Sequence, residues 1–390
     1  MNVRPKREYR NAGAVNSKRG TAYDELEEFA SYWSSLYRAR EKMERSLMYA
    51  KEDQWGDLVK NPDTDEVVTE GQLIMSQGKV PLKNNMIAPI VKNIEGQFRR
   101  NVTKPICSVR DKNEAKIGEM MSVAMEYAQS NNEVTELDAA CLMLLECGGF
   151  IAQRIEFGFN EYKHMNDAWV FNVDPSRLFF NTNIEDQRGW DITCIGEIFD
   201  MDFEQVVAAF SKSRSDRKWL ESIYGEQSFP KRSFVDGAQG YNQKNADFYT
   251  PADTNLCRVI LGWKLESRDA LFYTDMLDGS WGFVDVKDAE KIDAINQKRI
   301  EEARIAGVAD EDILLIEYEF KVERYWYYRY LTPWGDVLQE GRSPYWHGQH
   351  NYVFHAYPLI HGKIFNFIED FIDQQRSINR TMTLIDFIRS

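Results

Sequence analysis

Residues 364–390 constrain the fold more than any other part of the chain. Their apolar side chains recur three and four positions apart, which places them on one side of an α-helix. The predicted stripe, interrupted by the polar Gln375, comprises Ile364, Ile368, Phe371, Ile378, Met382 and Ile385. The last residues contain no Gly, Pro or other stop signal. We therefore expect either that the functional protein continues beyond residue 390 or that the stripe packs on a neighbouring chain.

The order of the predicted elements indicates a mixed α+β fold. Helical periodicity dominates the first part of the chain, with helices expected at about 24–50, 113–131 and 134–147, the last closed by Gly148-Gly149. A further helix, with Asn85 as its cap, is expected to extend to about Phe98. Segments rich in β-branched and aromatic residues follow, with strands expected at 257–266 and 270–276, and a charged helix is expected at 285–306. The polar residues 211–255 are predicted to form a long mobile excursion. At roughly 100–200 residues per domain, the chain should form two or three domains.

Charge limits the kinds of partner that the chain can bind. The net charge is -14, so tight general binding to DNA is disfavoured by like-charge repulsion. Residues 1–20 carry six cations and one anion, and this basic arm is either a solvated tail or a contact for nucleic acid or an acidic neighbour. No window approaches the length of about 20 apolar residues that crosses a bilayer, and no membrane partner is expected. The five cysteines lack metal-ligand spacing and are expected to be reduced core residues.

No motif for catalysis or cofactor binding is found. The sequence lacks the GxxxxGK[ST] phosphate loop and the GxSxG elbow, and its carboxylates form no acid–base or two-metal pattern. His347, His350, His355 and His361 are close in sequence, but no cysteine lies near them, and an exposed aromatic loop is the preferred interpretation over zinc. We therefore expect no catalytic residue, no cofactor and no metal, and a structural role.

Two further segments are candidate contact surfaces. The aromatic strand around Tyr325 and Tyr327 could stack on bases, but a subunit interface is the preferred interpretation because aromatic residues dominate interface cores. The basic residues Arg99, Arg100 and Lys104 form either a solvated face or a contact with DNA phosphates or an acidic partner.

Four stretches, taken in order, carry a resemblance to a known family. They are a long N-terminal helix running into residues 49–55 (YAKEDQW); Asn85 followed by Ile90-Val91, Ile94, Gly96, Arg99-Arg100-Asn101 and Pro105; Val173–Arg177 followed by Glu185-Asp186; and a β segment leading to Gly362 and a helix with Asp373–Arg376 and Asn379. Their order and spacing, over about residues 24–390, resemble the portal proteins of tailed bacteriophages, most closely the large portals of short-tailed phages. Large portals usually continue well past such a helix, so we expect either a truncated sequence or a shorter version.

The resemblance implies a portal-like architecture and a set of partners. It implies a ring of twelve copies at one capsid vertex, through which double-stranded DNA enters and leaves. It also implies contacts with the major capsid protein, the terminase and a tail adaptor, and a location in the virion after assembly in the host cytoplasm. The implied parts are a basic arm (1–23), a mixed wing (24–284, with the excursion 211–255), a stem helix (285–306), a small clip (307–363) and a second stem helix (364–390).

Two alternatives of different kinds stay open at this point. One is another structural ring or head–tail adaptor protein of the virion. The other is a nucleic-acid-processing enzyme whose site has no recognisable motif.

Overall fold

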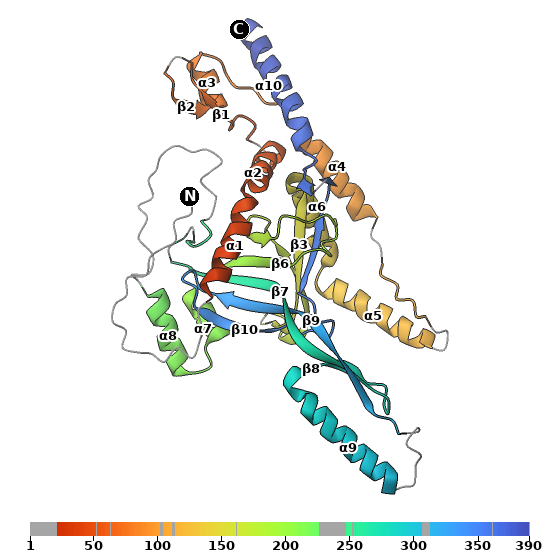
Figure 1. The fold of residues 1–390 in the computed structure, drawn as a ribbon. Coiled ribbons are helices and arrows are strands. Elements are labelled where there is room, and N and C mark those ends of the chain that lie inside the picture. Colours follow the sequence, from red (N-terminus) through yellow and green to blue (C-terminus); the bar gives the residue numbers. More distant parts are fainter. Residues whose placement is uncertain are drawn as a thin grey trace. The chain divides into compact units, whose positions relative to one another are not determined.

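The computed structural model describes residues 22–51, 53–62, 64–101, 104–110, 114–160, 162–225, 247–251, 253, 255–305, 313–360 and 362–389. The chain forms two compact units, drawn in Figure 1. Unit 1 comprises Met1–Gly262, Arg329–Gln339 and Asn351–Ser390, and unit 2 comprises Trp263–Tyr328 and Glu340–His350. The predicted basic arm lies outside the described residues, apart from its last two positions. The predicted α+β class is confirmed, because the two units contain both helices and antiparallel sheets.

The first predicted helix is two helices. They are α1 (Tyr23–Ser35) and α2 (Tyr37–Lys51), with a turn at Leu36. The break separates segments that enter different cores. Phe29 and Trp33 of α1 lie in a cluster with Phe179 and Ile260. Met43 of α2 lies in another cluster, with Val91 and Ile372. Leu36 is an ordinary helix former, so its residue type gives no warning of the turn.

A small element between α2 and α4 has no counterpart in the sequence predictions. It contains β1 (Leu58–Lys60), β2 (Val67–Thr69) and α3 (Glu70–Ser76). The strands pair antiparallel, and Thr69 begins α3 with a capping box that it shares with Gln72.

Three helices of unit 1 follow the predicted pattern closely. They are α4 (Ile87–Arg100), α5 (Ala115–Asn131) and α6 (Val134–Gly148). Asn85 begins α4, because its Oδ1 accepts hydrogen bonds of 3.0 Å from the N–H groups of Ile87 and Ala88. Gly149 ends α6 with φ 76°, and a Cβ at this position would lie 1.9 Å from the carbonyl oxygen of Phe365.

Two larger antiparallel sheets contain most of the strands. The first has the strand order β11-β3-β4 and comprises β3 (Phe150–Asn160), β4 (Met165–Val173) and β11 (Tyr352–Ala356). The second has the order β10-β9-β7-β6-β5 and comprises β5 (Leu178–Phe180), β6 (Cys194–Met201), β7 (Cys257–Asp275), β9 (Ile316–Leu331) and β10 (Val337–Arg342). The predicted strands at 257–266 and 270–276 are therefore one continuous strand, β7.

The beginning of the predicted polar excursion is ordered. Helix α7 (Phe203–Phe210) is followed by α8 (Arg214–Tyr224), whose Leu220 and Ile223 are buried against α7 and β7. The prediction of a mobile segment from residue 211 is therefore wrong for 214–224. The side chains of Leu220, Ile223 and Tyr224 are buried on one side of this polar helix and anchor it. Residues 226–246 lie outside the described residues.

Unit 2 is built on the continuations of β7 and β9. Strand β8 (Trp281–Asp285) pairs with β7, and the 3₁₀ turn η3 (Val286–Asp288) leads into α9 (Ala289–Ile305). The predicted helix at 285–306 is confirmed with its first turn in 3₁₀ geometry. Arg299 fixes α9 through a double hydrogen bond of 2.7 Å to each oxygen of Asp275.

The last helix begins five residues later than predicted. Residues 359–360 and 363–364 form the strand pair β12 (Leu359–Ile360) and β13 (Lys363–Ile364), and α10 spans Glu369–Arg389. Asn366 precedes the helix, and its Oδ1 accepts a 2.7 Å hydrogen bond from the N–H of Glu369. Ile364 is consequently a strand residue rather than part of the helical stripe.

Candidate functional site

The buried side of α10 is polar from Gln375 onward. Gln375, Asn379 and Thr383 are only 2%, 0% and 4% exposed. They accept hydrogen bonds from the backbone N–H groups of Met86, Asn84 and Leu82, at 2.9, 3.0 and 3.1 Å. We call these three side chains the polar ladder and residues 82–86 the strap.

Helix and strand geometry explain why the polar ladder fits the strap. Positions four apart on a helix advance by about 6 Å along its axis. Alternate residues of an extended chain advance by about 6.6 Å, so every second N–H of the strap meets the next ladder side chain. The Nε2 of Gln375 also donates to the carbonyl oxygen of Asn84 at 2.7 Å and to Oδ1 of Asn379 at 3.0 Å. The ladder therefore substitutes for a neighbouring β-strand.

The polar ladder is joined to the end of α2. Asn379 donates from Nδ2 to Oε1 of Gln54 at 2.7 Å, and Gln54 donates from Nε2 to the carbonyl oxygen of Tyr49 at 3.1 Å. Asn85 donates to the same carbonyl oxygen at 3.2 Å. These contacts satisfy the free carbonyl groups at the C-terminal end of α2, which has no glycine there.

An ionic network lies next to the polar ladder. Asp57 accepts hydrogen bonds from Arg45 at 2.8 and 3.0 Å and from the Tyr49 hydroxyl at 2.7 Å. Burial by itself would raise the pKa of Asp57, but the hydrogen bonds from Arg45 and Tyr49 outweigh it and hold the pKa below its usual value. The carboxylate is therefore ionised at neutral pH and acts as a fixed acceptor.

Glu70 is the second carboxylate of this network. It is 4% exposed and receives Nη2 of Arg376 at 2.9 Å and Nε of Arg380 at 2.5 Å. Both arginines belong to α10, and Arg376 also lies 3.4 Å from Asp57. The network thus ties α10 to α2 and to the small element that contains α3.

Three of the four sequence stretches that carry the family resemblance meet at this junction. Tyr49 and Gln54 come from the first stretch, Asn85 from the second, and the pair Gln375-Arg376 with Asn379 from the fourth. The third stretch lies elsewhere in unit 1, where the carbonyl oxygen of Ser176 accepts a 3.2 Å hydrogen bond from the Trp33 indole. The polar residues of these stretches that meet here share one structural task, which is to fix α10.

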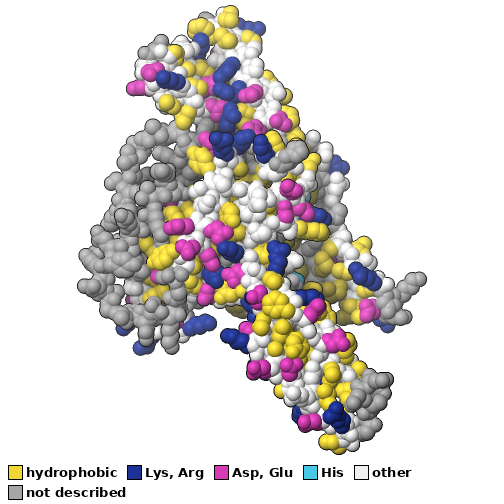
Figure 2. Space-filling model, in the orientation of Figure 1, with side chains coloured by type: hydrophobic (Ala, Val, Ile, Leu, Met, Phe, Trp, Pro, Cys, Tyr) yellow, Lys and Arg dark blue, Asp and Glu magenta, His cyan; other side chains and the backbone are white. Residues whose placement is uncertain are grey.

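The predicted apolar stripe of α10 is divided between its two sides. Ile368 is fully buried in its own chain, and Phe371 packs partly on the same cluster. Ile378, Met382 and Ile385 are 38%, 39% and 48% exposed. Figure 2 shows further hydrophobic side chains at the free end of α10, where Phe387 and Ile388 are exposed. The prediction of a subunit contact therefore rests on the three exposed residues, and it stays a prediction.

The aromatic strand contributes to contacts within unit 2. Tyr325 and Tyr327 are half-buried, with ring centroids 6.3 Å apart. The Tyr325 hydroxyl donates to Oε2 of Glu266 at 2.9 Å, and the Arg342 guanidinium lies 4.0 Å from the Tyr325 ring centroid. Part of each ring remains available for a further partner.

The predicted basic patch is largely neutralised within the chain. Arg99 contacts Glu95 at 2.8 Å and Glu136 at 2.5 Å, and Lys104 contacts Glu126 at 2.5 Å. Arg100 is exposed at the end of α4. A phosphate that bound here would have to compete with three carboxylates.

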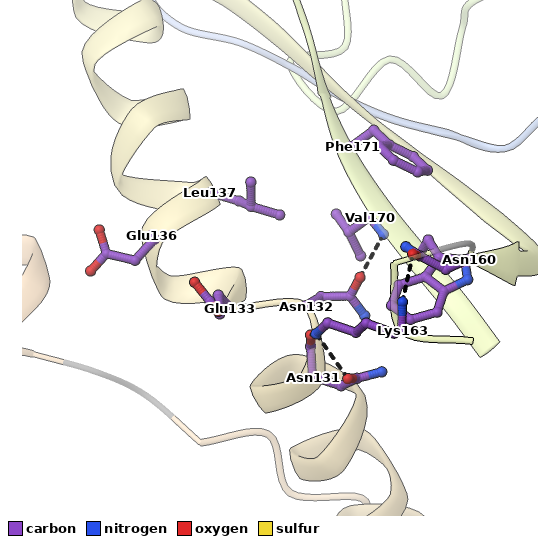
Figure 3. Close-up of a pocket in the computed structure, with 10 residues that line it drawn as sticks. Asn131, Asn132, Glu133, Glu136, Leu137, Asn160, Lys163, Val170 and Phe171 are labelled. Atoms are coloured by element: carbon purple, nitrogen blue, oxygen red, sulfur yellow. Dashed lines mark hydrogen bonds between the residues drawn. The ribbon is translucent and has the colours of Figure 1, made fainter. Parts of the chain in front are cut away.

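A cavity of about 250 Å³ lies where α5 ends and α6 begins, against the β3–β4 hairpin. Figure 3 shows Asn132 aimed at the strand and Glu136 pointing away from it. The Asn132 amide accepts from the N–H of Val170 at 3.0 Å and donates to the carbonyl oxygen of Ala168 at 2.9 Å. Lys163 donates to Oδ1 of Asn131 at 3.0 Å. The sequence signal that could have revealed this contact is the Asn pair at the junction of two helices.

The histidines do not form a metal site within the part of the chain that is described. No group of three His, Cys, Asp or Glu side chains is placed there to hold a metal ion. His347 stacks on Tyr345 with centroids 5.4 Å apart, and His350 lies edge-on to Trp326 at 4.6 Å. His361 lies outside the described residues.

The polar groups of this junction bind one another and the backbone, so the junction holds elements of the fold together. None of the described helices is both long enough and apolar enough to cross a membrane. The phage P22-like portal protein family matches residues 26–385, so the chain belongs to that family. No curated protein matches the chain.

Family membership confirms the predicted resemblance and decides between the alternatives. Portal proteins form the channel at the capsid vertex through which the genome is packaged and ejected. They are structural components of the virion rather than enzymes, and they assemble as an oligomeric ring with capsid and packaging partners. The enzyme alternative is therefore excluded.

Proposed function

We propose that twelve copies of this chain form the portal ring and that double-stranded DNA passes through its centre. The proposed partners are the major capsid protein around the ring, the terminase during packaging and a tail adaptor afterwards. The observation that supports this most is the family match over residues 26–385, which covers both units.

The proposed parts keep the boundaries expected from the sequence. The wing is 24–284 with its excursion 211–255, the stem helices lie within 285–306 and 364–390, the clip is 307–363, and the arm is 1–23. Support comes from α9 and α10, which occupy the two stem segments. Unit 2 joins α9 to parts of the proposed wing and clip, so a map of the ring would show which division applies.

The proposed subunit contacts include the exposed side of α10 and the aromatic strand. Ile378, Met382 and Ile385 are open to solvent in the single chain, and Tyr325 and Tyr327 are half-buried. A ring joins one face of each subunit to a different face of the next, so exposed apolar surface is needed on both sides.

The acidity of the chain suits a channel that DNA must cross without adhering. With a net charge of -14, carboxylates near the axis would repel phosphate. Arg99, Arg100 and Lys104 are proposed contacts for DNA or an acidic partner. Tight, salt-sensitive binding of DNA by the assembled ring would contradict a repulsive channel.

Electron microscopy of the purified protein tests the proposal. Class averages with twelve-fold symmetry and a central hole are the expected result. A protein that stays monomeric or dimeric at every concentration would refute it.

A further inference from the structure

Helix α5 has the sequence pattern of a helix that packs in a core. Apolar residues lie at positions i, i+3, i+4, i+7, i+10 and i+11 of this helix. This α5 face comprises Ile117, Met120, Met121, Ala124, Tyr127 and Ala128. Such a pattern predicts that this side of the helix is covered by other apolar groups.

The single chain leaves the α5 face open. Ile117, Met120, Met121 and Tyr127 are 55%, 72%, 53% and 55% exposed. Val123 and Met125, at the borders of the face, are also exposed. A contiguous apolar patch of this kind marks an interaction site.

The other side of α5 makes the contacts within the chain. Gly118 is buried, and a Cβ at this position would lie 3.0 Å from the carbonyl oxygen of Cys107. Ser122 accepts a 2.8 Å hydrogen bond from the N–H of Cys107 through its Oγ. The helix is thus held on this side by Gly118, Ser122 and Met125, whose sulfur lies 3.2 Å from the Cys107 sulfur, while the residues of the α5 face lie on the other side of the helix.

A second open apolar surface lies on strand β3. Ile155, Phe157 and Phe159 occupy alternate positions on one face of the β3–β4 hairpin, and they are 39%, 74% and 59% exposed. We call them the β3 row. Their antiparallel partners Val170 and Ala168 extend the same face with apolar side chains.

The two surfaces match in chemistry and in length. The α5 face extends over about 16 Å, from the helical rise of 1.5 Å per residue. The β3 row extends over about 13 Å, from the strand rise of about 3.3 Å per residue. A ring subunit needs two different surfaces that fit each other, and a helix on an exposed strand face satisfies this need.

Other occupants of the α5 face fit less well. A helix that lies on a membrane carries a polar face rich in Lys and Arg, whereas the polar side of α5 carries Glu119 and Glu126. The same carboxylates disfavour nucleic acid. A protein surface is left, and each copy of the chain brings its own β3 row.

We propose that the α5 face of one copy packs on the β3 row of a second copy. This proposal depends on the proposed ring. It assigns the interface between neighbouring subunits to two surfaces of unit 1.

Charge substitutions in the full chain test this contact. Met120→Glu and Phe157→Glu should each raise the concentration for half-assembly at least tenfold, measured by mass photometry. The matched control is Ser130→Glu, which adds the same charge at an exposed position off the α5 face and should change assembly less than twofold. Circular dichroism must show that the variants are folded.

Disulfide formation gives a second readout that does not depend on weakened assembly. One preparation carries Met120→Cys and another carries Phe157→Cys, and the two are mixed before oxidation. Covalent dimers should form in the mixture and not in either variant alone. Each variant oxidised alone also contains the native Cys107, so it serves as the control for disulfides that Cys107 forms.

The outcomes separate this contact from the proposed ring. Rings that assemble normally from both Glu variants, with no dimers in the mixture, would overturn the contact and leave the ring intact. A disulfide within one chain that carries both cysteines, without dimers in the mixture, would also overturn it. A wild-type chain that never forms rings would refute both proposals.

Discussion

Replacing Asn379 by Leu tests whether the polar ladder holds the strap. Asn379 is 0% exposed and makes three hydrogen bonds: it accepts from the Asn84 N–H and from Gln375, and it donates to Gln54. Leucine has the same branching and the same number of side-chain heavy atoms, so the change removes hydrogen bonds without leaving a cavity. The Asn84 N–H and the Gln54 Oε1 lose their partners, and Gln54 is itself only 1% exposed.

The expected loss follows from these two groups. A buried polar group without a partner costs about 1–3 kcal/mol, so two groups cost about 2–6 kcal/mol. The added apolar side chain returns about 1 kcal/mol. We expect the free energy that opposes local opening at the strap to fall by about 1–5 kcal/mol.

Hydrogen exchange of the backbone amides of residues 82–86 measures this loss where it occurs. At about 1.4 kcal/mol per tenfold change, exchange of the Asn84 amide should accelerate by at least about fivefold. The control is Thr381→Val, which removes an exposed hydroxyl of α10 that donates only to the Ser377 carbonyl oxygen. Unchanged exchange at the strap in Asn379→Leu would show that the ladder does not hold it.

Three further predictions concern other buried features. Burial, together with a nearby carboxylate, raises the pKa of Glu146 to about 7, so the free energy of unfolding should fall as the pH rises from about 4.5 to 7. Glu146→Gln should remove this part of the pH dependence, measured by urea unfolding at a series of pH values. Gly149→Ala should prevent stable folding, because its Cβ would lie 1.9 Å from a backbone oxygen. The control is Gly348→Ala, at a position with φ 67° and open space around it. This variant should lower the free energy of unfolding by only about 1 kcal/mol, measured by thermal unfolding. Arg40 is 2% exposed, its guanidinium lies 3.8 Å from the Trp33 ring centroid, and its three nitrogen atoms have no hydrogen-bond partner among the described residues. Because a buried charge without a partner is costly, Arg40→Met should stabilise the chain by about 1 kcal/mol. A lower melting temperature of the variant would contradict this.

The helical half of unit 1 shows how far local pattern reaches. Helices α5 and α6 were predicted to within two residues because their apolar spacing is regular and a Gly pair ends α6. The Asn85 cap was also predicted, because a cap depends on neighbours two and three positions away. The small element with α3 was missed, since its strands are three residues long and give no periodic signal.

The polar junction could be predicted only as a set of separate motifs. The sequence contained Gln54, Asn85 and the Gln375–Asn379 segment, but nothing in their spacing showed that they touch. Asn84 and Asn379 are 295 positions apart in the chain. Contacts of this range depend on how helices and strands pack, which local propensity does not specify.

Sequence alone determined the α+β class, most helices and the membership of the portal family, because these depend on local periodicity and on the order of short motifs. Tertiary structure decided which side of α10 is buried. The apolar spacing predicted a stripe interrupted only at Gln375, yet Asn379 is buried and Ile385 is exposed. The reason is physical: the backbone N–H groups of the strap that face α10 require acceptors, and unsatisfied backbone groups cost more than exposed apolar side chains.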